Sequence, residues 1–177
     1  MKKYFKQVAS FDTINIKQEL KDTNLWNWLN IRKAFYGSKH NSVDDIVLRF
    51  QSVQGKFKVK NFFDTEECSD FFVQQYLPHT MEVIKQLTKG FSVGRIVIAK
   101  LKAGGIIDSH IDEGLYHKNY SRYHMVVDTN KEVVFTCLDE QQHMNEGSIW
   151  WFNNRVTHSV INNGTTDRTH IVLDIKR

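Results

Sequence analysis

Two histidines and one aspartate are the strongest candidates for catalytic side chains in this sequence. His110 and Asp112 stand two residues apart in a run that predicts a β-strand, and His158 follows 48 residues after His110. Since alternate residues of a strand point to the same face, the first imidazole and the carboxylate should lie side by side. Two imidazoles and one carboxylate form the facial triad of non-haem Fe(II) oxygenases. Zinc sites with three protein ligands are the alternative.

Arg168 adds a second kind of chemistry. It lies 10 residues after His158 and begins an apolar run that predicts the last strand. A guanidinium pairs in bidentate fashion with a carboxylate, so Arg168 suits the distal carboxylate of a dicarboxylic acid cosubstrate. Taken alone, the residue would more simply pair with an acid such as Asp167 or Asp139. Together with the triad, it favours the cosubstrate.

Short β-rich runs separated by turns must position these residues. This pattern predicts a sandwich or jelly roll rather than a parallel sheet. The expected strands are 93–101, 106–112, 123–128, 132–138, 148–152, 158–162 and 168–176.

The first half of the chain, 1–90, mixes helix and strand. We expect helices at 23–35, 65–76 and 78–87, and strands at 45–50 and 56–62. The 177 residues suit one domain, with 1–90 as support and lid and 91–177 as a β core that carries the metal site.

Several segments together resemble the aspartyl/asparaginyl β-hydroxylase family of 2-oxoglutarate oxygenases, and its bacterial small-molecule members most. The segments are Gly105–Asp112, Arg122–His124, Glu146–Gly147, His158 and Asp167–Ile175. The resemblance implies a double-stranded β-helix, a cupin-like jelly roll, with the N-terminal α/β portion packed on it. The enzymes that give the family its name have glycine where this chain has Asp112, which points away from the peptidyl-Asp/Asn enzyme itself.

The resemblance also implies roles and cofactors. His110 and His158, with Asp112, would hold Fe(II), and Arg168 would bind the far carboxylate of 2-oxoglutarate. Arg122 and His124 match the family's R-x-H pair, which helps to hold the cosubstrate end nearer the metal. A core or surface ion pair is their alternative.

The expected reaction is hydroxylation of a free amino acid, a small derivative or a peptidyl residue, with O₂ consumed and 2-oxoglutarate converted to succinate and CO₂. His40, Arg49 and His170 are the candidate substrate-binding residues. The alternatives are an oxygenase acting on nucleic acid or a nucleobase, and a non-catalytic or zinc-dependent cupin-like module.

Composition narrows the choice of partners. The net charge of +4 comes from scattered lysines and arginines interspersed with 20 acidic residues, which predicts a mixed solvated surface rather than a nucleic-acid face. No run approaches the roughly 20 apolar residues of a membrane span. Without a recognisable export signal, a cytoplasmic location is expected, and Cys68 and Cys137 should be free thiols. The oligomeric state is not encoded in these patterns.

Overall fold

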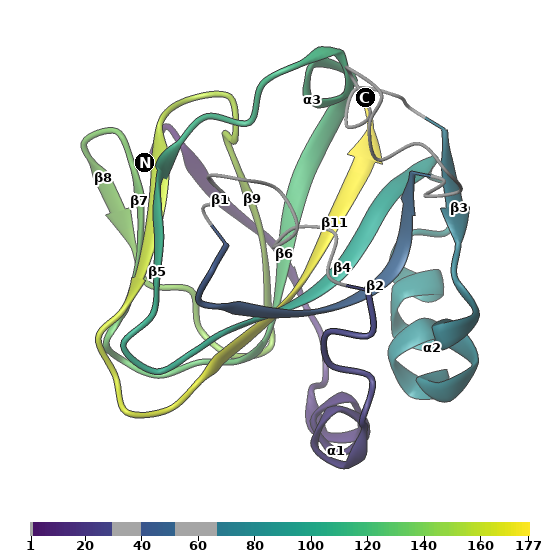
Figure 1. Ribbon diagram of the computed structural model, residues 1–177. Helices are drawn as coiled ribbons and strands as arrows, with labels where there is room; N and C mark the ends of the chain where they lie inside the picture. The colour runs from purple at the N-terminus through teal and green to yellow at the C-terminus, as the bar shows by residue number, and fades with distance from the viewer. Residues whose placement is uncertain (1, 30–39, 52–66) are drawn as a thin grey trace.

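The fold consists of two facing antiparallel sheets. The computed structural model describes residues 2–29, 40–51 and 67–177. The larger sheet has the order β1-β9-β6-β11-β4-β2-β3, and the smaller has the order β5-β10-β7-β8 (Figure 1). The larger sheet contains β1 (Phe5–Ser10), β9 (Ser148–Phe152), β6 (Tyr120–Asp128), β11 (Arg168–Lys176), β4 (Val93–Leu101), β2 (Val43–Gln51) and β3 (Cys68–Asp70). The smaller contains β5 (Ile106–His110), β10 (His158–Asn162), β7 (Val133–Cys137) and β8 (Glu140–Gln142).

The described residues form three apolar cores, and strand alternation creates the two larger ones. Along β11, Ile171 and Leu173 belong to a core on the outer face of the larger sheet, while Val172 packs against a second core between the sheets. Residues of both sheets, including Val126 and Phe135, form this inner core. The two-sheet arrangement confirms the predicted jelly roll. Because side chains alternate along a strand, neighbouring residues of β11 point into different cores.

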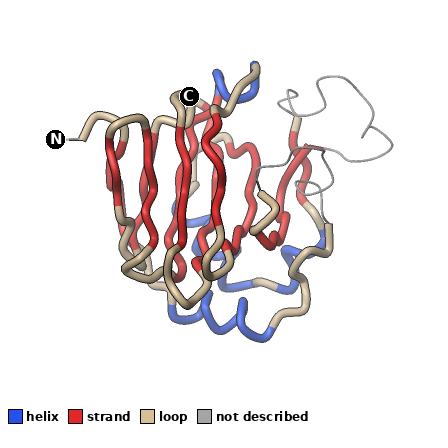
Figure 2. Tube along the Cα trace, turned by 60° about the vertical axis from the view of Figure 1, so that its left-hand side comes forward, coloured by secondary structure: helices blue, strands red, loops and turns tan. Residues whose placement is uncertain are grey.

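Two helices support the larger sheet from outside. Helices α1 (Ile14–Asp22) and α2 (Pro78–Leu87) contribute to the outer core. In Figure 2 they lie below the strands as drawn, whereas short α3 (Leu115–Asn119) lies above, near the C-terminus. Within the described residues, no helix is both long and apolar enough to span a membrane.

The predicted helix at 23–35 is wrong over its described part. The helix lies earlier, at α1, and Thr23 is its C-cap residue with extended backbone. Ile16 and Leu20, four residues apart, supply the buried stripe. Asn27 has a φ of 60°, which stops a right-handed helix, yet Trp26 still packs against the outer core.

The segment predicted as a helix at 65–76 also differs. Its described part forms strand β3, which pairs with Arg49–Gln51 of β2, followed by a short 3₁₀ helix, Phe72–Tyr76. In the folded chain this segment pairs with the free edge of β2. Such tertiary pairing outweighs the local helix propensity on which the prediction depended. The predicted strand at 56–62 lies outside the described residues. Helix α2 and strands β4–β7 and β9–β11 are confirmed, with small shifts at their ends, whereas the short β8 was not predicted.

Candidate metal centre

The smaller sheet places the two histidines next to each other. His158 of β10 is the direct cross-strand partner of His110 at the end of β5, and their ring centroids are 4.3 Å apart. Asp112 follows two residues later, where its backbone N–H donates to the carbonyl of Asn154 at 3.1 Å. One potential ligand atom from each of the three residues lies within 4.8 Å of the others. The predicted triad is therefore assembled by strand pairing together with one loop contact.

Hydrogen bonds fix which histidine nitrogens face the centre. Nδ1 of His110 lies 2.6 Å from the carbonyl oxygen of Asp108, and Nδ1 of His158 lies 2.9 Å from that of Val156. A carbonyl oxygen only accepts, so both Nδ1 atoms carry the proton. The lone pair of each ring is then on Nε2, the atom free to ligate a metal.

The carboxylate of Asp112 is oriented in the same way. Its Oδ2 accepts hydrogen bonds from Nη1 of Arg122 at 2.5 Å and from Nδ2 of Asn154 at 3.0 Å. Its Oδ1 lies 3.9 Å from Nε2 of His110. Since Oδ2 already has two donors, Oδ1 is the oxygen that would be left to bind a metal.

Arg122 is itself held by a second acid. Arg122 and Asp174 are direct cross-strand partners on β6 and β11. Nε and Nη2 of Arg122 donate to the two oxygens of Asp174 at 2.9 and 3.0 Å. Arg122 thus joins two carboxylates, and its guanidinium is oriented toward Asp112 by a bidentate pair.

Charge and burial set the protonation states that a cation needs. Burial alone would raise the pKa of Asp112, but Arg122, with smaller contributions from His117 and His158, holds that pKa well below its usual range. Burial, opposed by Asp112 and assisted by the neighbouring His110, lowers the pKa of His158 to about 4. At neutral pH the centre therefore offers a carboxylate and, at His158, a neutral imidazole, the forms that bind a divalent metal.

A neighbouring polar cluster lies deeper between the sheets. Arg168, His124 and His170 all project from the larger sheet and are at most 7% exposed. Burial lowers the pKa of His124 and of His170 well below the usual value, and the charge of Arg168 lowers both further. Phe152 connects the cluster to the triad, since its ring centroid is 5.1 Å from that of His124 and 5.1 Å from that of His158.

The candidate substrate residues separate into near and distant positions. The ring of His40 lies 5.9 Å from that of His110, beside the triad. Arg49 donates to Asp70 at 2.9 Å and to the carbonyl of Val93 at 3.2 Å, at the edge where β2 meets β3. These contacts hold Arg49 at the β2–β3 edge, whereas His40 stands next to the triad.

Three site residues were missed in the sequence. Asn154 and Asp174 hold Asp112 and Arg122, and His117 lies 3.5 Å from Asn154. Asp174 carried a usable signal, because it shares its β11 face with Arg168 by alternation. His117 and Asn154 lie outside the strands, where no periodicity marks them.

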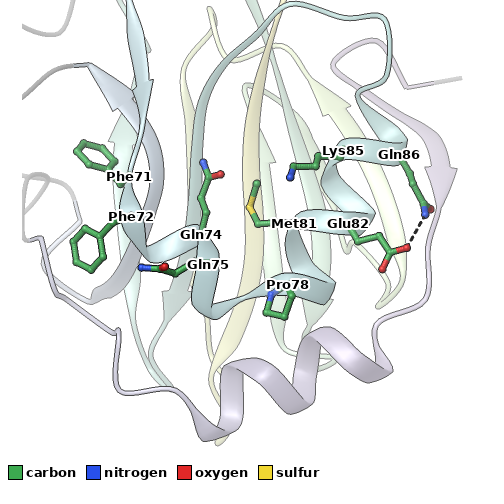
Figure 3. Close-up of a pocket in the computed structure, with 9 residues that line it drawn as sticks. All are labelled: Phe71, Phe72, Gln74, Gln75, Pro78, Met81, Glu82, Lys85 and Gln86. Carbon is green, nitrogen blue, oxygen red and sulfur yellow. Dashed lines mark hydrogen bonds between the residues drawn. The ribbon is translucent and has the colours of Figure 1, made fainter.

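The triad is separate from the large surface hollow shown in Figure 3. That hollow, with a volume of about 750 Å³, runs along α2 and the preceding 3₁₀ helix. Its lining residues are Phe71, Phe72, Gln74, Gln75, Pro78, Met81, Glu82, Lys85 and Gln86. No ligand of the triad and no member of the Arg168 cluster is among them, so the chemistry is to be sought between the sheets.

Comparison with known proteins agrees with this geometry. A family model described as aspartyl/asparaginyl beta-hydroxylase matches residues 15–177. The L-proline cis-4-hydroxylase of Rhizobium meliloti (strain 1021) is 27% identical over 100 residues, which is 56% of this chain and 36% of that protein. The aligned region therefore spans about a third of that curated relative.

Two solved structures share the fold at low sequence identity. A prolyl hydroxylase from Trichoplax adhaerens, in complex with a peptide fragment of the hypoxia inducible factor oxygen degradation domain, has a TM-score of 0.57 and 9% identity, covering 97% of this chain and 83% of that chain. An oxidoreductase of the 2OG-Fe(II) oxygenase family from Burkholderia pseudomallei has a TM-score of 0.55 and 11% identity, covering 83% and 74%.

Proposed function

Since the chain belongs to the aspartyl/asparaginyl β-hydroxylase family, we propose that it is an Fe(II)- and 2-oxoglutarate-dependent dioxygenase. Its substrate would be a free amino acid, a small amino-acid derivative or a peptidyl residue. The observation that carries the proposal is the triad itself, with one ligand atom from each of His110, Asp112 and His158 within 4.8 Å of the others. Two imidazoles and a carboxylate leave adjacent coordination positions open, as a non-haem Fe(II) oxygenase requires.

The residues present fit the metal. Nε2 of His110, Nε2 of His158 and Oδ1 of Asp112 would hold Fe(II), because each partner atom, Nδ1 or Oδ2, is already hydrogen-bonded. When bound, Fe(II) together with 2-oxoglutarate and O₂ supplies the oxidising power for hydroxylation, with succinate and CO₂ as co-products. The protein's part is to orient the reactants and to exclude water.

The cosubstrate would extend from the triad toward Arg168. Arg168 is 1% exposed, and its guanidinium suits the distal carboxylate of 2-oxoglutarate. His124 lies along this path, because its ring contacts Phe152 and its pKa responds to both Arg168 and His158. These contacts support a role for His124 at the cosubstrate.

Arg122 is proposed to act chiefly through Asp112. All three of its side-chain nitrogens donate to Asp112 or Asp174. Its effect on the cosubstrate would then follow from the position and charge of the ligating carboxylate. Arg122 is in this sense a positioning residue.

The substrate would approach the triad beside His40. Its ring is 5.9 Å from His110, which makes His40 the better supported of the proposed substrate contacts. The named substrate of the curated relative, L-proline, supports an amino-acid-type substrate for this chain. Arg49, oriented to Asp70, is a weaker candidate.

The test is a substrate screen with the Fe(II)-loaded protein. Proline and other amino acids, N-acylated amino acids and short peptides would each be incubated with 2-oxoglutarate and O₂, and succinate would be quantified. Mass spectrometry would seek the gain of one oxygen atom in the substrate, with His110→Ala as the inactive control. Substrate-dependent succinate and a hydroxylated product are expected. Turnover with oligonucleotides and none with amino acids or peptides would show that the substrate is a nucleic acid. Tight zinc binding without 2-oxoglutarate turnover would contradict the proposal that the protein is an oxygenase.

A further inference from the structure

His170 presents a buried ring nitrogen that still needs a partner. It stands two residues after Arg168 on β11, on the same inward face, and is 1% exposed. Its Nδ1 lies 3.1 Å from Nδ1 of His124, while its Nε2 has no hydrogen-bond partner in the part of the chain that the structure describes. A buried polar atom left unpaired is costly, so this position suggests a ligand.

The contact with His124 restricts where the protons can be. Only one of the two facing Nδ1 atoms can carry a proton, because the other must accept the hydrogen bond. If His124 donates, His170 carries its own proton on Nε2, and that nitrogen becomes a hydrogen-bond donor. Burial and the charge of Arg168 hold both rings neutral, so neither ring holds two protons at neutral pH.

The charge of Arg168 favours one of the two possible proton positions on His170 when a ligand binds. A ligand that satisfies a buried guanidinium is an anion, and an anion requires donors from its other neighbours. His170 is close enough to Arg168 for that charge to lower its pKa. An anion bound there would therefore select the form in which His170 presents N–H.

We propose that His170 donates a hydrogen bond from Nε2 to the distal carboxylate of 2-oxoglutarate, beside Arg168, with His124 fixing its tautomer. This inference rests on the proposed function. It makes His170 a cosubstrate residue rather than the substrate-binding residue expected from its position in the sequence.

The test compares two ligands that differ in one group. 2-Oxopentanoate has the same five-carbon chain and the same metal-binding end as 2-oxoglutarate, but a methyl group replaces the distal carboxylate. Each would be titrated anaerobically into the Fe(II) protein, with the dissociation constant taken from the visible charge-transfer band. The readout is binding and requires no turnover.

Two variants separate the donor from the packing. The amide of His170→Asn ends near the position of Nδ1, while that of His170→Gln reaches toward Nε2. His170→Asn should weaken 2-oxoglutarate binding by roughly 10- to 100-fold, the range for a hydrogen bond to a charged group, and leave 2-oxopentanoate binding unchanged. His170→Gln should recover part of the loss. The ratio of the two dissociation constants within one variant does not depend on how much of the protein is folded.

The failures of the two proposals are distinguishable. If wild-type Fe(II) protein forms no band with either ligand, the proposed function fails. If wild type binds 2-oxoglutarate and Arg168→Gln weakens it, but His170→Asn leaves the ratio unchanged, the oxygenase stands and the role of His170 is refuted. An equal loss for both ligands in His170→Asn would likewise assign His170 to packing.

Discussion

Replacing Asp174 by asparagine removes one charge from the buried row Asp112–Arg122–Asp174. Asp174 is 1% exposed and accepts two hydrogen bonds from Arg122, at 2.9 and 3.0 Å. Asparagine keeps the shape but brings an N–H₂ group against guanidinium donors. Arg122 would then have Asp112 as its remaining anionic hydrogen-bond partner among the described residues.

The expected loss of stability can be bounded from the burial of the pair. Removing one partner of a buried ion pair costs about 3–5 kcal/mol, and Asp174→Asn should fall near the lower end because Asp112 still faces Arg122. The chain offers a matched exposed pair, Arg49 with Asp70, at 2.9 Å and with the Asp70 side chain 61% exposed. Asp70→Asn should cost about 0–1 kcal/mol, as for surface pairs.

The assay is urea unfolding of the metal-free protein, followed by circular dichroism at pH 7. The slope of the free energy against urea should be similar in both variants, so the midpoints report stability. The Fe(II) dissociation constant of Asp174→Asn should also rise by roughly 10- to 100-fold, as when the hydrogen-bond partner of a ligand is lost. Equal destabilisation by the two substitutions, with unchanged Fe(II) affinity, would refute the reasoning that Asp174 acts on the ligand through Arg122.

Three further predictions concern titration, packing and reactivity. In the folded protein burial lowers the pKa of His117 to about 4, so the unfolded chain takes up this proton at a higher pH than the folded one. The free energy of unfolding should therefore fall as pH drops from about 6.5 to about 4. His117→Asn should reduce the dependence of this free energy on pH by up to about 1.4 kcal/mol per pH unit. Gly94→Ala should cost about 1–3 kcal/mol in denaturant unfolding, because a Cβ there would lie 2.7 Å from the Tyr120 ring. Cys137 should react with a thiol reagent only after unfolding, since it is fully buried and burial raises its pKa to about 12.

The β core was predictable because alternation carries the information. In β11, Arg168, His170 and Asp174 fall on one face and Ile171 and Leu173 on the other. The same period predicted that His110 and Asp112 would lie side by side, but β5 ends at His110 and a backbone contact with Asn154 places Asp112. The strand β1 was missed because five of its six residues are exposed and show no alternation.

The ion pairs of Arg122 with Asp112 and Asp174 could not be predicted in the same way. Arg122 meets Asp174 because β6 and β11 pair in one register, and a sequence does not state which strands pair. Asn154 reaches Asp112 from a loop, where no periodicity applies. The alternative considered for Arg122, an ion pair, describes its hydrogen bonds, although both of its acids belong to the candidate metal centre.

Anaerobic titration of Fe(II) into the metal-free protein with 2-oxoglutarate present would test the assignment of the iron site. A visible charge-transfer band that saturates at one Fe(II) per chain is expected, and it should be absent in His110→Ala and weaker in Arg168→Gln. No band in the folded, iron-loaded wild-type protein would contradict the assignment of His110, Asp112 and His158 as the iron site of a 2-oxoglutarate oxygenase.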